Sequence, residues 1–179
     1  MPAPLRLFFA IWPDAAAGEA TAALAREVAA ARRGKPPPAV NAHLTLAFLG
    51  AVTPDRVDAL GEVGAAAARA AAPFALTLDR LGGFRDGGIA WLGADPVPAP
   101  LADLARALRE GLSEHRFPVE RRPFAAHVTL ARKCRILPAR EGVAPVTWHV
   151  DTLSLVASQL AAGGSRYHNL AEWPLGPPP

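Results

Sequence analysis

The feature that most constrains this chain is a six-residue sequence that occurs twice. AHLTLA at residues 42–47 recurs as AHVTLA at residues 126–131, nearly half of the 179-residue chain later. The copies differ only where Leu44 is replaced by Val128. A repeat at this period indicates a duplicated structural unit. We therefore predict a single domain over residues 1–179, with two internal lobes that each carry one copy of the motif.

The spacing within each copy places two polar side chains together. Residues two apart on a strand point to the same face, about 6.5 to 7 Å from each other. His43 and Thr45 therefore share a face, while Leu44 turns to the opposite, apolar face, and His127 and Thr129 repeat the arrangement. If the two strands face each other, two imidazoles and two hydroxyls form one site.

A phosphate suits such a site better than a metal does. Two histidines can supply a general base and a general acid on opposite sides of phosphorus, and two hydroxyls can hydrogen-bond its oxygens. A zinc site needs more ligands than two histidines, and neither motif contains a carboxylate. We expect no metal and no cofactor. The alternative, that both histidines are structural, is weakened because the same pattern occurs in two equivalent settings.

The remaining pattern predicts an α+β fold with antiparallel pairing, because most strands after the first helix follow one another directly. The arrangement we expect is two-lobed and pseudo-symmetric, with duplicated antiparallel sheets, helices on the outer faces and the active site in the cleft between the lobes. About seven strands are expected, at residues 5–11, 43–49, 74–81, 89–92, 124–132, 150–160 and 167–173. Helices are expected at residues 14–33, 54–72 and 98–115.

Composition narrows the class of protein. One cysteine, Cys134, excludes a disulfide framework and suits a reducing compartment. The net charge of +3 and the pI of 9.7 are compatible with a phosphate-bearing partner. No apolar run is long enough to span a membrane, and the short run at residues 5–12 contains Arg6. We expect a cytoplasmic monomer that does not bind membranes.

The doubled motif resembles the paired motifs of the 2H phosphoesterases. The likeness is greatest to the RNA 2',3'-cyclic phosphodiesterase branch, also called 2'-5' RNA ligase-like. It extends to the opening strand RLFFAI at residues 6–11, to TLAFLG at residues 45–50, and to RPF at residues 122–124 before the second motif. Ser158, Tyr167 and the WPL sequence at residues 173–175 are also similar. The resemblance covers nearly the whole chain.

This resemblance implies an activity and a mechanism. The chain is expected to hydrolyse RNA 2',3'-cyclic phosphate ends, including those of tRNA fragments, to 2'-phosphomonoester ends. In the family's mechanism His127 is the proton acceptor, which takes a proton from water, and His43 is the proton donor to the departing ribose oxygen. Thr45 and Thr129 bind the phosphoryl oxygens. The near-symmetric repeat itself does not tell the acid from the base.

Two further site residues are suggested. The resemblance makes Arg132 a phosphate contact, but strict strand alternation turns it away from His127, so this role requires a bulge or a strand end at Ala131. Tyr167 is a candidate for stacking on a base, whereas Phe48 is expected to pack in the core. Basic residues near both motifs could follow an RNA backbone: Arg32, Arg33, Lys35, Arg121, Arg122, Lys133 and Arg135. His115, His149 and His168 lie outside any motif and are expected to be structural or surface residues.

Other functions on the same scaffold remain open. One is a 2'-5' RNA ligase that joins tRNA half-molecules, and another is an enzyme that opens a small cyclic nucleotide. A third is a module that binds nucleotides without turnover, although the intact His and Thr residues of both copies argue against it.

Overall fold

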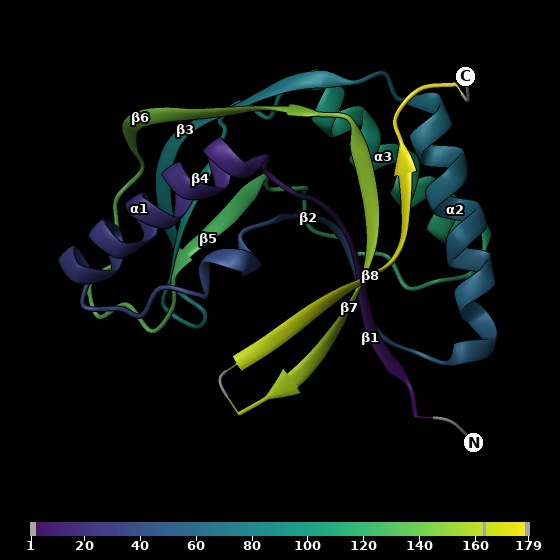
Figure 1. Ribbon diagram of the computed structural model, residues 1–179, viewed down its shortest axis with the longest axis horizontal. Coiled ribbons are helices and arrows are strands. Elements are labelled where there is room, and N and C mark those ends of the chain that lie inside the picture. The colour runs from purple at the N-terminus through teal and green to yellow at the C-terminus, as the bar shows by residue number, and fades with distance from the viewer. Residues whose placement is uncertain (1–2, 163, 178–179) are drawn as a thin grey trace.

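The computed structural model describes residues 3–162 and 164–177, which form eight strands and three α-helices (Figure 1). The order is β1 (Leu5–Ile11), α1 (Ala15–Ala31), β2 (Leu44–Val52), α2 (Val57–Ala70), β3 (Phe74–Phe84), β4 (Ile89–Gly93), α3 (Ala99–Glu114), β5 (His127–Ala131), β6 (Glu141–Val150), β7 (Thr152–Ala161) and β8 (Gly164–Pro174). Short 3-10 helices, η1 (Ala39–Asn41) and η2 (Pro54–Arg56), precede β2 and α2. The predicted class, helices with an antiparallel sheet, is confirmed.

The two motif strands are neighbours at the centre of the sheet. The strand order is β6-β3-β4-β5-β2-β1-β7-β8, and every pairing is antiparallel. Four strands lie on each side of the contact between β5 and β2. That contact consists of one residue pair, Leu44 with Val128. The repeated sequences therefore meet at the join between two groups of four strands.

The helices cover one face of this sheet. Leu7, Phe9 and Ile11 of β1 belong to one buried cluster together with residues of all three helices, among them Val28, Leu60 and Leu104. Phe8 and Ala10 turn to the opposite face and form a separate small cluster with Val156. β1 is buried on both faces, as expected for a central strand, and the face of Phe8 and Ala10 is left for the site.

Local signals account for the helix starts. The Asp14 side chain accepts a hydrogen bond of 2.8 Å from the Ala17 main-chain N–H, so Asp14 is the N-cap of α1. The start of α2 is different, because the Thr53 side chain makes no capping bond and Pro54 begins the 3-10 turn η2 before the helix. Proline fixes the backbone dihedral there but donates no hydrogen bond.

The predicted strand pattern missed β6. The strand expected at 150–160 is β7 (Thr152–Ala161), and the ten residues before it form β6 at the edge of the sheet. Pro145 and Gly142 are unfavourable in the interior of a strand, but an edge strand tolerates proline because one side of its backbone is unpaired. Val146, Trp148 and Val150 alternate with exposed residues, and this alternation was the signal that could have identified it.

None of the helices within the described residues is long and apolar enough to cross a membrane.

Candidate active site

The pairing of Leu44 with Val128 brings the four motif side chains together. Because the strands run antiparallel about this pair, Thr45 lies beside His127 and His43 lies beside Thr129. Leu44 and Val128 are buried, while all four motif side chains are partly exposed on the other face. The predicted alternation is confirmed, and the main-chain register sets position 45 opposite 127 and position 43 opposite 129.

Both imidazoles are held in the same way. The Nδ1 atom of His43 lies 2.7 Å from the main-chain carbonyl oxygen of Asn41, and Nδ1 of His127 lies 2.8 Å from that of Ala125. A carbonyl only accepts, so each Nδ1 carries the proton and donates it. In the neutral ring Nε2 then has the free electron pair, and in the charged ring Nε2 is the second donor. Each histidine therefore offers Nε2 for proton transfer.

The two copies differ in what Nε2 contacts. Nε2 of His43 lies 3.1 Å from the Thr45 hydroxyl oxygen, whereas no such bond joins His127 to a threonine within the described part of the chain. When His43 is charged, its Nε2 donates to Thr45; when it is neutral, Thr45 donates to it. His43 is therefore the more restrained of the two rings.

Burial lowers the pKa of both histidines. For His43 the hydrogen bond to Asn41 opposes this shift, and the nearby charges of His127 and Arg132 lower the pKa further. For His127 the main cause is again burial, the bond to Ala125 opposes it, and the charge of Arg132 adds to it. A positive charge on one imidazole makes protonation of the other less favourable, so the state in which both rings are charged is disfavoured. A state with one neutral and one charged imidazole is the arrangement that acid–base catalysis requires.

Arg132 reaches the site face through a β-bulge. Trp91 pairs with Thr129 and Ala90 pairs with Ala131, so Leu130 is an extra residue in β5. Leu130 and Ala131 are both buried, which interrupts the alternation and returns Arg132 to the face of His127. The bulge that this placement required is present. The main chain of Arg132 also forms an antiparallel β-bridge with that of Lys35, which precedes the first motif.

The same bulge occurs in the first copy, and it overturns the prediction for Phe48. Ala10 pairs with Thr45 and Phe9 pairs with Ala47, so Leu46 is the extra residue. Phe48 then pairs with Phe8 and lies on the site face, where 50% of its surface is exposed. The expectation that Phe48 packs in the core is wrong. Phe48 is the counterpart of Arg132, at the same distance along the repeat.

Aromatic rings border both histidines but in different numbers. The ring centroids of Phe8, Trp12 and Tyr167 lie 5.0, 5.4 and 5.1 Å from that of His43. On the other side only Phe84 is this close among the described residues, with its ring perpendicular to His127 at 5.0 Å. Tyr167 therefore lies beside His43, and its stacking on a base stays a prediction. Phe84 was missed, because nothing in its local sequence, between Gly83 and Arg85, distinguishes it from a core residue.

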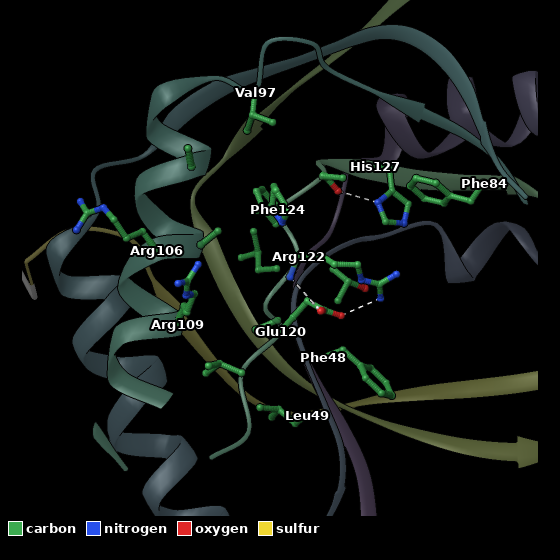
Figure 2. A pocket seen from close by; sticks show the side chains of 18 of the residues that line it. Phe48, Leu49, Phe84, Val97, Arg106, Arg109, Glu120, Arg122, Phe124 and His127 are labelled. Atoms are coloured by element: carbon green, nitrogen blue, oxygen red, sulfur yellow. Dashed lines mark hydrogen bonds and ion pairs between the residues drawn. The ribbon is translucent and has the colours of Figure 1, made fainter. Parts of the chain in front are cut away.

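A cavity of 1220 Å³ opens on the His127 side (Figure 2). It is lined by His127 and Thr45, by Phe48 and Phe84, by the segment of residues 118–125 and by one side of α3. His43 and Thr129 do not line it. The cavity therefore begins at His127 and Thr45 and extends along β2 as far as Leu49.

An ion pair shapes the rim of this cavity. The Glu120 carboxylate accepts hydrogen bonds from the main-chain N–H groups of Arg121 and Arg122, at 2.9 and 3.1 Å. It also accepts a bond of 2.8 Å from the Arg122 guanidinium (Figure 2). The guanidinium and main-chain bonds of Arg122 lower the pKa of Glu120 to about 2. Glu120 thus remains charged and holds the segment that leads into β5.

Comparison with known proteins identifies the family. Residues 12–161 match the model of the 2'-5' RNA ligase superfamily. The chain belongs to the 2'-5' RNA ligase superfamily. An RNA 2',3'-cyclic phosphodiesterase of Escherichia coli K12 is 36% identical over 98% of this chain and 99% of its own length. One from Thermus thermophilus is 32% identical over 96% of this chain and 90% of its own length.

Solved structures of this superfamily share the fold. The crystal structure of E. coli LigT complexed with 3'-AMP superposes with a TM-score of 0.85 at 34% identity. The match covers 96% of this chain and 98% of that one. The resemblance to this family predicted from the repeated motif is confirmed.

The three histidines outside the motifs and the single cysteine do not join the four motif side chains. His149 and His168 are exposed on β6 and β8, and His115 bonds to Glu62 at 3.3 Å between α3 and α2. Cys134 is half-buried and unbridged. No group of three or more His, Cys, Asp or Glu residues that could hold a metal ion occurs in residues 3–162 and 164–177. Independence from metals stays a prediction.

Proposed function

We propose that this protein hydrolyses RNA ends that carry a 2',3'-cyclic phosphate and leaves a 2'-phosphomonoester. The observation that carries the proposal is the matched pair of histidines, each with Nδ1 bonded to a carbonyl and Nε2 available for proton transfer. The names of the E. coli and Thermus relatives support the same activity.

The reaction divides between the two copies of the motif. Neutral His127 takes a proton from water at Nε2, and the water oxygen forms a bond to phosphorus. The bond between phosphorus and the ribose 3' oxygen breaks, and charged His43 gives that oxygen a proton from Nε2. The product has a 2'-phosphate and a free 3'-hydroxyl, and the proton count balances. The strained cyclic ester needs no ATP.

The neighbouring side chains stabilise the charge that develops. The Thr45 and Thr129 hydroxyls donate to the phosphoryl oxygens that do not take part in bond breaking. Arg132 supplies a positive charge on the same face, and a bound phosphate would in turn raise the lowered pKa of His43, which makes it a usable acid. Tyr167, whose ring lies 5.1 Å from His43, stacks on the base of the terminal nucleotide.

The test is incubation with a short RNA that ends in a 2',3'-cyclic phosphate, with 2'- and 3'-phosphate products resolved. We expect the 2'-phosphate alone. A 3'-phosphate product would reverse the leaving group, and recovery of the intact cyclic end in a tight complex would indicate a binding module. Adding an RNA with a free 5'-hydroxyl tests for 2'-5' joining, in which that hydroxyl replaces water.

A further inference from the structure

Phe48 is an exposed aromatic residue at the edge of the proposed site. Single exposed apolar residues are common on protein surfaces and carry no conclusion by themselves. Phe48 differs because the bulge at Leu46 turns it to the site face, and because it lines the cavity that contains His127 (Figure 2). Its ring is therefore presented to the space that a substrate would occupy.

Arg6 covers one side of this ring. The guanidinium carbon of Arg6 lies 4.8 Å from the ring centroid of Phe48, within the range of a cation–π contact. Arg6 and Phe8 are two residues apart on β1, so Arg6 lies on the same face. The pair forms a layered arrangement of a cation on an aromatic ring. A nucleobase stacked on Phe48 would add a third layer.

The charges around the cavity favour a polyanion, because four arginines line it, Arg85, Arg106, Arg109 and Arg122, against two carboxylates, Asp86 and Glu120. Arg106 is paired with Asp103 and Glu110, and Arg122 is paired with Glu120. Arg85 and Arg109 also line the cavity, and no ion pair joins either of them to another described residue. A positively charged cavity that is also lined by aromatic rings is the combination that binds single-stranded nucleic acid.

We propose that Phe48, backed by Arg6, is a stacking platform for the base of the nucleotide that precedes the terminal one. This rests on the proposed function, because it takes the terminal phosphate to lie between the histidines. It adds a second nucleotide subsite and makes the enzyme prefer an RNA strand over a mononucleotide.

Distance and volume favour the preceding nucleotide over the terminal one. Phe48 lies three residues beyond Thr45, which is about 10 Å along a strand. The cavity of 1220 Å³ is larger than the roughly 300 to 1,000 Å³ of a site for one small molecule. Tyr167 remains for the terminal base, on the His43 side of the pair.

The test compares two substrates on the full-length protein: a nucleoside 2',3'-cyclic phosphate and a dinucleotide that ends in one. Stacking on an aromatic ring is worth about 5- to 150-fold per base. In Phe48→Leu, which keeps an apolar side chain but no ring, we expect the ratio of dinucleotide to mononucleotide kcat/KM to fall by this factor, through KM. Phe48→Tyr should retain the wild-type ratio, and Arg6→Gln should lower it by a smaller factor.

Leu170→Ala is the matched control, because Leu170 has a similar exposure of 44% on β8. An unchanged ratio in Phe48→Leu, or an equal loss on both substrates, overturns the proposal. Equilibrium binding of a dinucleotide that ends in a 2'-phosphate separates this from the proposed function. If the wild type turns over neither substrate but Phe48→Leu still weakens dinucleotide binding, the proposed function fails and the platform stands. If turnover occurs without that weakening, the platform fails alone.

Discussion

The two copies of the motif share a backbone and differ in what surrounds it. Each has a histidine whose Nδ1 donates to the carbonyl two residues earlier, and each has a bulge directly after the threonine. Beyond the bulge the first copy presents Phe48 and the second presents Arg132. The copies therefore supply similar reactive groups, and the residues outside the repeat make one side aromatic and the other cationic. This difference can assign separate tasks to two nearly identical strands.

The largest expected effect is loss of either histidine. His43→Ala and His127→Ala each remove a general acid or base and should lower kcat by about 10² to 10⁴. The double variant should lose less than the product of the two, because both act in one step. His168→Ala, on the exposed surface of β8, is the control. Near-normal activity in His43→Ala with loss in His168→Ala would make the motif a scaffold only.

Arg132 tests the cationic side of the comparison. Charged hydrogen bonds contribute about 1.5 to 3 kcal/mol, so Arg132→Gln should lower kcat/KM by roughly 10- to 150-fold. Its charge also lowers the pKa of both histidines, so its removal should move the bell-shaped pH profile of kcat/KM to higher pH. In the wild type that profile should lie on the acid side of the ordinary histidine range, because burial lowers both pKa values.

Measuring the same profile in Arg135→Gln provides the control for a general change of surface charge. Arg135 is exposed and follows the same motif. An equal shift in both variants would show that net charge, rather than the position of Arg132 after the bulge, sets the pKa values.

The threonines should show a smaller, unequal effect. Each neutral hydrogen bond contributes about 0.5 to 1.5 kcal/mol, so Thr45→Ala and Thr129→Ala should lower kcat by roughly 2- to 10-fold. Thr45→Ala should cost more, because its hydroxyl also bonds to Nε2 of His43. Thr45→Ser keeps the hydroxyl and should restore most of the rate. A larger loss in Thr129→Ala would reverse the inferred difference between the copies.

Chelation should have the smallest effect. If the two imidazoles divide the proton transfers, activity in excess EDTA should stay close to that of the untreated enzyme. Loss of turnover that a divalent cation restores would show that a metal, rather than the second copy, completes the reaction.

The sequence predicted seven of the eight strands described here, and the shared face of the His and Thr side chains within each motif, because the repeat and the alternation of apolar residues are local. It did not predict what depends on pairing. The bulge at Leu46 arises from the register between β1 and β2, so Phe48 was expected on the wrong face. Likewise Phe84 reaches His127 only through the long hairpin of β3 and β4. A comparison of the two copies would have extended the reasoning about Arg132 to Phe48.

The two motif strands pair through Leu44 and Val128 in the way that two identical subunits pair across a two-fold axis. In an isologous interface, residue i of one partner meets residue j of the other, and j meets i. Here position 45 lies opposite 127 and position 43 lies opposite 129, so the two strands present their histidines and threonines to one face in a reciprocal order. Under the proposed mechanism, which needs one histidine from each copy, neither copy suffices alone. A substitution in either motif strand at this contact is therefore expected to disturb both copies of the motif, although the copies lie far apart in the sequence.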